Sequence, residues 1–378
     1  MKKGLALVLA LVMALSLVAC GSGNNGGGNN NGGNGGNGGN NGGDGGSAGG
    51  DGMNISVLYY NYSDAFISNV RNEMDAKWAE MGITANNQDG QTNAGTQLDQ
   101  VNTAIANGAQ ALVVNAVEAS ADETTQAIVD AAKNANIPVI FFNREVSDDV
   151  INSYDLAAFV GTDPAEAGHM QGELIGNYLV ENYDAVDLNG DGVISYVMFK
   201  GQENNPEAEY RTQYAVEDAN AILEAAGKPA LAYYDSAAST QYLVDPNGSW
   251  SAAAAQDYMT TVLSAYSEAN GNMVELVIAN NDDMGLGAIT ALQTAGYNNG
   301  EGSTVIPVFT VDGLQGIVDA INAGNATGAV GQSATGLAEA VATLLQNYQE
   351  TGDLMSNTEG MIVDEACAKI RVPYTTVS

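Results

Sequence analysis

The stretch Asp187-Leu-Asn-Gly-Asp-Gly-Val-Ile-Ser195 is the part of the chain on which the choice of fold depends. Side-chain oxygens stand at alternate positions, on Asp187, Asn189 and Asp191, a glycine follows at the sixth position, and Ser195 stands at the ninth. This is the oxygen spacing of an EF-hand calcium loop, in which the glycine permits a sharp turn. The alternative is an acidic turn without metal, since Asp, Asn and Gly are common turn formers.

The loop is incomplete as a local calcium site. Its seventh residue, Val193, can offer a backbone carbonyl, but its twelfth is Met198, where an EF-hand carries a bidentate glutamate. The residues that follow the loop, 194–199, are typical of a strand and not of a second helix. Calcium can therefore bind only if the fold brings a carboxylate from a distant part of the chain.

The N-terminus has the features of an export signal. Met1-Lys-Lys precedes an apolar run, 4–18, which is too short to span a membrane. The run ends in Leu17-Val-Ala-Cys20-Gly21, which resembles a bacterial lipobox. We therefore predict that residues 1–19 are a lipoprotein signal peptide and that Cys20 is lipidated, which anchors the protein to the outer face of the cell membrane. Residues 20–52, mostly Gly and Asn, are expected to form a flexible tether.

The bulk composition excludes several classes of protein. The formal net charge of −34 disfavours nucleic-acid binding and a basic DNA-binding face. His169 is the only histidine, which makes histidine-based nucleophilic catalysis and a multi-histidine zinc site improbable. We expect it on the surface of a helix. Cys367 is the only thiol after Cys20, so we expect no disulfide framework.

After residue 52, apolar runs alternate with helical periods. This alternation predicts βαβ units and parallel sheets, and about 325 residues exceed one comfortable core, so we expect two α/β lobes. The expected strands are 55–60, 83–87, 111–115, 138–143, 195–200, 230–235, 274–279, 305–311, 327–332 and a short one near 370–374. The expected helices are 67–81, 96–106, 124–134, 165–180, 206–226, 251–270, 284–295, 314–323 and 336–351.

Polar side chains follow nearly every predicted strand. Ligands of open parallel sheets bind at the carboxyl ends of the strands, so these side chains are candidates for a ligand site. No glycine-rich phosphate fingerprint follows any strand, and the glycines of Met284-Gly-Leu-Gly287 are expected to serve packing. The candidates are Asp64, Phe66, Asn115, Asn205, Glu207, Arg211, Asn280, Asn281, Asp282, Asp312 and Gln332.

The ordered set of motifs resembles one family over essentially all of residues 54–376. The chain is similar to the D-galactose/D-glucose-binding proteins, which are type I substrate-binding proteins of sugar ABC transport and chemotaxis. The motifs are Tyr62-Ser-Asp-Ala-Phe66, Ala111-Leu-Val-Val-Asn115, Ile137-Pro-Val-Ile-Phe-Phe-Asn143, Ser153-Tyr-Asp155, Val160-Gly-Thr-Asp163, the loop 187–195, Lys200-Gly201, Ala208-Glu-Tyr-Arg-Thr212, Val277-Ile-Ala-Asn-Asn-Asp282, Val311-Asp312 and Arg371-Val-Pro-Tyr374.

The resemblance implies the type I periplasmic-binding-protein fold, in which two doubly wound parallel-sheet lobes are joined by a three-segment hinge. Transferred to this chain, the N-terminal lobe is 53–143 with 333–370, and the C-terminal lobe is 144–332 with 371–378. The family closes about its hinge when sugar binds in the cleft, and an ABC permease reads the closed form. We therefore expect a monomeric binding protein, not an enzyme, that delivers a galactose- or glucose-like hexose to a permease.

The resemblance also assigns the contacts with the sugar. Phe66 and Trp250 would stack on the apolar faces of the pyranose ring. The hydroxyls would be bound by Asp64, Asn115, Arg211, Asn281 and Asp312. Asp64 stands where the family's carboxylate contacts the hydroxyl that distinguishes the glucose and galactose epimers.

The chain departs from the family at several of these positions. Asn205 stands in place of a histidine, Glu207 in place of an aspartate and Gln332 in place of an asparagine. A segment of roughly residues 239–249 is inserted before Trp250, with Tyr242 as an alternative stacking residue. These departures leave the identity of the sugar open.

The resemblance also supplies the missing calcium ligand. In the family the bidentate carboxylate comes from a distant strand, and the matching residue is Glu275, whose alternative role is that of a solvated residue at the start of a strand. The predicted ligands of a structural Ca²⁺ are Asp187, Asn189, Asp191, Val193, Ser195 and Glu275.

Three other functions were weighed. A sugar sensor for a chemoreceptor or histidine kinase is compatible with the same sequence. An extracellular glycosidase could use Asp64, Glu207 or Asp312 as its two carboxylates, but these residues match a binding pattern. A transcription regulator would need a helix-turn-helix and a basic face, which the export signal and the acidic composition oppose.

Overall fold

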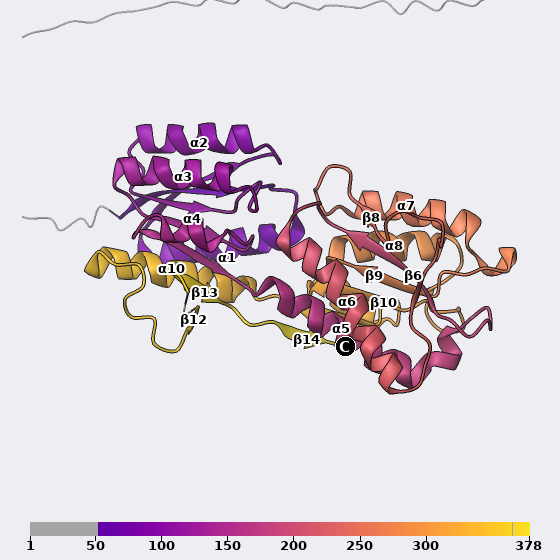
Figure 1. The fold of residues 1–378 in the computed structure, drawn as a ribbon. Helices are drawn as coiled ribbons and strands as arrows, with labels where there is room; N and C mark the ends of the chain where they lie inside the picture. The colour runs from indigo at the N-terminus through magenta and orange to yellow at the C-terminus, as the bar shows by residue number, and fades with distance from the viewer. Residues whose placement is uncertain (1–51, 365) are drawn as a thin grey trace, which may run out of the picture. The chain divides into compact units, whose positions relative to one another are not determined.

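The computed structural model describes residues 52–364 and 366–378, which form two α/β lobes. The predicted signal peptide, the predicted lipidation site Cys20 and nearly all of the predicted tether lie outside the described residues. The two lobes are built on two seven-stranded sheets, and most strand pairs in both are parallel (Figure 1). This confirms the predicted fold class.

The first sheet has the strand order β12-β13-β5-β4-β3-β1-β2. Its central strands are apolar runs that are buried throughout, because helices cover both faces of the sheet. In Figure 1, α2 and α3 lie on one side of it and α1 and α10 on the other. The strands are β1 (Asn54–Tyr59), β2 (Thr84–Asp89), β3 (Ala111–Val114), β4 (Val139–Phe142), β5 (Ala157–Gly161), β12 (Ile362–Val363) and β13 (Lys369–Arg371), and the helices are α1 (Ala65–Met81), α2 (Ala94–Ala106), α3 (Asp122–Ala135), α4 (Asp148–Asn152) and α10 (Ala334–Thr351).

The second sheet has the order β14-β11-β10-β9-β6-β7, with β8 paired to β6. Helix α5 packs on α6, and α7 packs on α8. The strands are β6 (Ser195–Lys200), β7 (Ala232–Tyr233), β8 (Leu243–Val244), β9 (Leu276–Ala279), β10 (Val308–Asp312), β11 (Gly328–Gly331) and β14 (Thr375–Val377), and the helices are α5 (Pro164–Val186), α6 (Pro206–Ala225), α7 (Ala252–Ala265), α8 (Asp282–Thr294), α9 (Gln315–Asn322) and the 3₁₀ turn Glu268–Asn270.

The boundary between the lobes differs from the prediction. The sequence placed the first crossing after residue 143, but β5 pairs with β4 and β13 in the first sheet, so that crossing follows Gly161. The difference arises because the predicted strands do not include 157–161. It is a short run of small and apolar residues, buried throughout, and such a strand lacks the alternation that marks a half-buried one. The other two crossings run from β11 to α10 and from β13 to β14.

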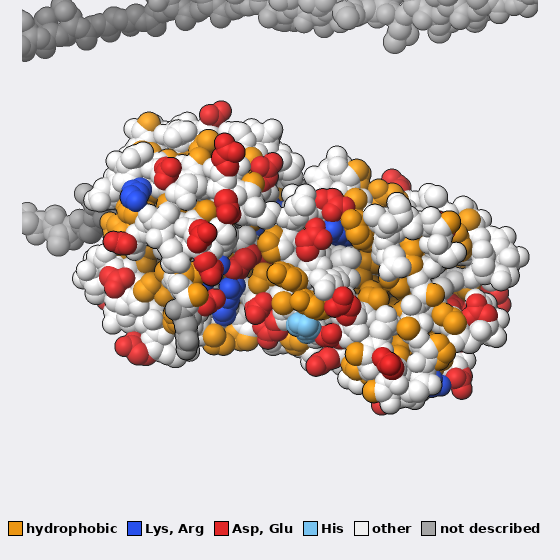
Figure 2. All heavy atoms as spheres, in the orientation of Figure 1, with side chains coloured by type: hydrophobic (Ala, Val, Ile, Leu, Met, Phe, Trp, Pro, Cys, Tyr) orange, Lys and Arg blue, Asp and Glu red, His pale blue; other side chains and the backbone are white. Residues whose placement is uncertain are grey.

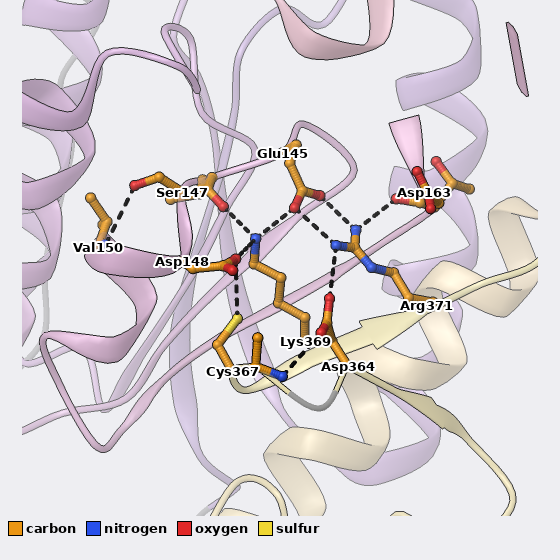
Figure 3. A network of polar contacts seen from close by, with 12 residues as sticks. Glu145, Ser147, Asp148, Val150, Asp163, Asp364, Cys367, Lys369 and Arg371 are labelled. Atoms are coloured by element: carbon orange, nitrogen blue, oxygen red, sulfur yellow. Dashed lines mark hydrogen bonds and ion pairs between the residues drawn. The ribbon is translucent and has the colours of Figure 1, made fainter. Parts of the chain in front are cut away.

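An ionic network lies next to the crossings (Figure 3). Glu145, in the loop after β4, accepts hydrogen bonds from Lys369 Nζ at 2.5 Å and from Arg371 Nη1 at 2.6 Å. Arg371 also donates to the carbonyl of Thr162 in the first crossing, at 2.9 Å. The hydroxyl of Thr162 lies 2.7 Å from that of Tyr374 in the last crossing. These bonds tie two of the three crossings to each other and to the first lobe.

Candidate functional site

A cavity lies between the carboxyl ends of the two sheets. This is where an open parallel sheet binds its ligands. Its walls contain three carboxylates, two guanidinium groups and three aromatic rings. The lining residues are Tyr60, Asp64, Phe66, Ile67, Asn143 and Arg144 from the first lobe, Asn205, Glu207, Arg211, Trp250, Asn281 and Asp312 from the second, and Gln332 from the crossing after β11.

Nine of the ten residues predicted to contact a sugar line this cavity. The exception is Asn115, which follows β3 as expected but is fully buried behind the wall. Its amide donates to the carbonyl of Phe142 at 3.0 Å and to Asn143 Oδ1 at 3.3 Å. Asn115 therefore joins two strand ends, and Asn143 lines the cavity in its place. Tyr242, the alternative stacking residue, does not line the cavity. The Lys200 ammonium lies 4.3 Å from the centre of its ring.

The sequence prediction missed four lining residues: Tyr60, Ile67, Asn143 and Arg144. Asn143 and Arg144 directly follow β4, so the strand-end rule that found the other candidates would also have found them. The predicted first strand ends at Tyr60, and the predicted first helix begins at Ile67. Their exposure to the cavity depends on the packing of the second lobe, for which the sequence offers no signal.

The first-lobe wall is organised around Asp64. As the N-cap of α1 it accepts the N–H of Ile67 at 2.8 Å, and its other oxygen accepts the hydroxyl of Tyr60 at 2.5 Å. Burial raises the pKa of Asp64, and these two hydrogen bonds oppose the shift. The guanidinium of Arg144 lies 4.2 Å from the centre of the Tyr60 ring. The carboxylate is thus held in one orientation by its neighbours.

In the second lobe, polar residues lie at the ends of β9, β10 and β11. Arg211 donates to the carbonyl of Asn280 at 2.9 Å and lies 3.9 Å from Asp312. Asp312 accepts from the amide of Gln332 at 2.6 Å. Burial, together with the nearby Asp282 carboxylate, raises the pKa of Asp312 well above its ordinary value.

Three buried polar atoms in this wall have no hydrogen-bond partner among the described residues. They are Oε2 of Glu207, Nε of Arg211 and Oε1 of Gln332. An unpaired buried polar group costs about 1–3 kcal/mol, so native proteins rarely leave such groups together without a purpose. Two of these atoms are acceptors and one is a donor. A ligand that donates at two points and accepts at a third would satisfy all of them.

Three hydrogen bonds cross from the first lobe to the connection between β6 and α6 and to the first turn of α6. The backbone N–H of Glu145 donates to Glu207 Oε1 at 2.8 Å. Arg144 donates to the side chain of Gln202, and the hydroxyl of Ser120 donates to the carbonyl of Asn204. The structure therefore has the two lobes in contact around the cavity.

The predicted calcium ligands meet in the second lobe. Glu275 is fully buried beside the loop 187–195, and its two oxygens accept the N–H groups of Asn189 at 3.1 Å and Ser195 at 3.0 Å. Asp187 likewise accepts from Gly190 and Gly192 within the loop. The fold therefore brings the distant carboxylate to the loop.

The chemistry of this set fits a hard cation, although the carboxylates do not surround one point. Asp187, Asp191 and Glu275 form no ion pair within the described part of the chain, and burial raises the pKa of Glu275. Between residues 52 and 378, residue 365 aside, no group of three or more His, Cys, Asp or Glu side chains is arranged to hold a metal ion. The ligand set would have to contract around an ion.

The molecular surface agrees with the acidic composition. The face drawn in Figure 2 carries many acidic and few basic side chains. His169 is exposed on α5, as predicted, with Nδ1 2.6 Å from Asp218. None of the described helices is both long and apolar enough to cross a membrane.

The fold and the cavity define a two-lobed ligand-binding protein, and comparison with known proteins places it in a family. The model of the periplasmic binding protein domain matches residues 55–353. The D-galactose/methyl-galactoside binding periplasmic protein MglB of Haemophilus influenzae is 34% identical over 324 residues, 85% of this chain and 88% of that protein. The galactofuranose-binding protein YtfQ of Escherichia coli is 25% identical over 273 residues, 72% of this chain and 74% of that protein.

Solved structures share the fold. An ABC transporter solute-binding protein from Clostridium phytofermentans with bound β-D-glucose has a TM-score of 0.67 at 18% identity, covering 86% of this chain and 94% of that one. The chain belongs to the type I periplasmic binding protein family. It is a binding protein and not an enzyme, as predicted, and the family implies an extracytoplasmic place of action.

Proposed function

We propose that this protein is an ABC-transporter solute-binding protein that captures a monosaccharide, a galactose- or glucose-like hexose, and delivers it to a membrane permease. The observation that carries the proposal is the set of three unpaired polar atoms, on Glu207, Arg211 and Gln332, in the wall of a cavity that also contains Phe66 and Trp250. A sugar hydroxyl can donate and accept at once, so the hydroxyls of one ring could pair all three atoms. The apolar faces of a pyranose suit aromatic rings.

Closure of the lobes follows from the same arrangement. The cavity walls come from both lobes, so a ligand that contacts both stabilises the closed form and shifts the population towards it. The galactose-binding relative from Haemophilus influenzae supports a hexose as the ligand. The longer side chains Glu207 and Gln332 favour testing a panel of sugars over galactose and glucose alone.

Calorimetry tests the proposal. D-Galactose, D-glucose and other aldoses, with methyl galactosides, are titrated into the soluble protein that begins at residue 52. We expect at least one to bind with a micromolar or tighter Kd, and Gln332→Leu to weaken it about tenfold or more by removing one polar partner. Gln346→Leu, on the exposed side of α10, is the matched control. If the whole panel fails to bind at micromolar levels, the proposal is wrong.

We also propose a structural Ca²⁺ held by Asp187, Asn189, Asp191, Ser195, Glu275 and the carbonyl of Val193. Its support is the position of the buried Glu275 carboxylate against the loop. The ion would stabilise the second lobe and take no direct part in sugar binding, since neither the loop nor Glu275 lines the cavity.

The export and anchoring of the protein complete the proposal. Cleavage before Cys20 and its lipidation would hold the binding domain near the permease by the Gly- and Asn-rich tether. Metabolic labelling with a fatty acid should mark the wild type, while Cys20→Ala should stay unlabelled.

A further inference from the structure

The inserted segment 239–249 contains a buried carboxylate close to the aromatic wall of the cavity. The Asp245 side chain is only 3% exposed. Its Oδ1 accepts the N–H of Asn247 at 2.8 Å, and its Oδ2 accepts both the N–H and the hydroxyl of Ser251, at 2.9 and 2.7 Å. No lysine or arginine pairs with it among the described residues. Three hydrogen bonds therefore hold this carboxylate in place.

Trp250, the residue before Ser251, has a backbone conformation that needs such support. Its φ is +57°, in the left-handed region that a bulky residue rarely adopts. A conformation of this kind persists only when the surroundings hold it. On the C-terminal side Asp245 holds Ser251, which is the N-cap of α7. From α8, the Asn281 amide donates to the Trp250 carbonyl at 3.2 Å.

The tryptophan ring packs directly against the backbone of Gly201. A Cβ placed on Gly201 would come within 2.0 Å of the Trp250 ring. The start of α7 is packed equally closely, since a Cβ on Gly287 would lie 2.1 Å from the carbonyl of Ala252. The ring can face the cavity only if the backbone at 250–252 keeps this path.

The inserted segment is itself joined to the sheet. Its strand β8 pairs with the last two residues of β6, Phe199 and Lys200, and the Asp245 N–H donates to the Lys200 carbonyl at 3.0 Å. Asp245 is thus fixed to the sheet through its backbone and to Ser251 through its side chain. The insertion connects a rigid strand with the residue that carries the aromatic ring.

We propose that Asp245 is a positioning residue, which fixes the Trp250 ring as a wall of the ligand cavity. Asp245 fixes the ring already in the ligand-free protein. The effect of this on ligand affinity rests on the proposed binding of a sugar. Loss of the Asp245 carboxylate would release the left-handed backbone at Trp250, so that the ring would gain mobility and exposure. A ligand would then have to order it again on binding.

Fluorescence of the ligand-free protein provides the first test. The chain has two tryptophans, so Trp78→Phe leaves Trp250 as the only one. In this background we expect Asp245→Ala to increase the acrylamide quenching constant about threefold or more, because Trp250 is only 7% exposed. Asp235→Ala is the matched control, because Asp235 also forms a turn near the insertion, with the N–H of Ala237, but does not contact residues 250–251. Unchanged quenching with Asp245→Ala would overturn the proposal.

A double-mutant cycle provides the second test, with the hexose that the wild type binds best. Asp245→Ala should weaken the wild type about tenfold, but weaken Trp250→Ala less than about twofold, since the two residues act through one contact. An equal loss in both backgrounds would contradict a positioning role. If Asp245→Ala does not fold, Asp245→Asn keeps the shape of the side chain but sets an amide N–H against the backbone N–H of either Asn247 or Ser251, and both measurements are made on it. If no sugar binds the wild type, the proposed function fails, while the quenching result still decides the role of Asp245.

Discussion

The Oε1 atom of Glu207 lies 2.8 Å from the backbone nitrogen of Glu145, so one carboxylate on α6 bonds the second lobe to the first. Its other oxygen is buried without a partner among the described residues, and Glu207 is one of the residues that line the cavity. Burial raises the pKa of Glu207, and the N–H of Glu145 is the largest effect that opposes the shift. The same side chain can therefore contact the ligand and the opposite lobe at once.

Two substitutions of Glu207, to Gln and to Asp, should each weaken ligand binding. Glu207→Gln can keep one acceptor for Glu145 but turns a donor towards the cavity, and Glu207→Asp is too short to serve both. We expect a loss of about tenfold or more in hexose affinity, since a hydrogen bond to a charged group contributes about 1.5–3 kcal/mol. Calorimetry measures it, with Glu217→Gln on the exposed face of α6 as the control. Affinity equal to that of the wild type in Glu207→Gln would count against a ligand contact.

Substitution of Glu275 should separate calcium binding from sugar binding. Glu275→Gln removes one of the two oxygens that face the loop, so we expect calcium affinity to fall about tenfold or more. The melting temperature of the variant in calcium should fall towards that of the wild type after a chelator has removed the calcium. Its sugar affinity should stay within about twofold of the wild-type value. Glu224→Gln, exposed on α6, is the control. Calcium affinity unaltered by Glu275→Gln would show that the carboxylate is not a ligand.

Asp282 should make the protein less stable as the pH rises. Burial raises its pKa from 3.8 to about 7, so the folded state keeps a proton that the unfolded state has lost. The free energy of unfolding should therefore fall between about pH 4 and pH 7, and this loss persists at higher pH.

Asp282→Asn should remove this component of the pH dependence. The amide can still accept the N–H of Leu314 and donate to the hydroxyl of Thr310, so both existing contacts are kept. We expect the variant to exceed the wild type by at least about 1 kcal/mol at pH 8 in urea unfolding, and to differ less at pH 5. Asp319→Asn, exposed on α9, should follow the wild type. The same pH slope in Asp282→Asn and wild type would refute the assignment.

The network at the crossings should contribute to stability. Glu145→Gln removes the charge that pairs with the buried Lys369 and with Arg371, while Asp148 still lies 2.6 Å from Lys369. Breaking a buried ion pair costs about 3–5 kcal/mol, and the remaining carboxylate reduces this, so we expect a loss of about 2 kcal/mol. Urea unfolding measures it, with Glu350→Gln as the exposed control. A loss no greater than that of the control would mean that the network adds nothing.

The cavity was largely predictable because its residues occupy a repeated position in the chain. Asp64, Asn205 and Asn281 each follow a strand and cap the next helix, and parallel strands bring such positions to one edge. Asn115 also directly follows a strand, although it caps no helix, and yet it lies behind the wall. Whether a residue just past a strand faces the cavity or the neighbouring strand depends on packing, which the rule does not contain.

The sequence by itself determined the alternation of strands and helices, the two-lobe α/β class and most of the polar set, because each depends on local periodicity and turn chemistry. It also showed that the loop 187–195 needed a carboxylate from elsewhere. The resemblance to a family named Glu275 as that carboxylate, and the tertiary structure places it beside the loop. Only the tertiary structure decided that the first crossing follows Gly161, and that Arg144 and Glu207 meet partners from the opposite lobe. Each of these depends on contacts between residues far apart in the chain, for which no local pattern of residues carries a signal.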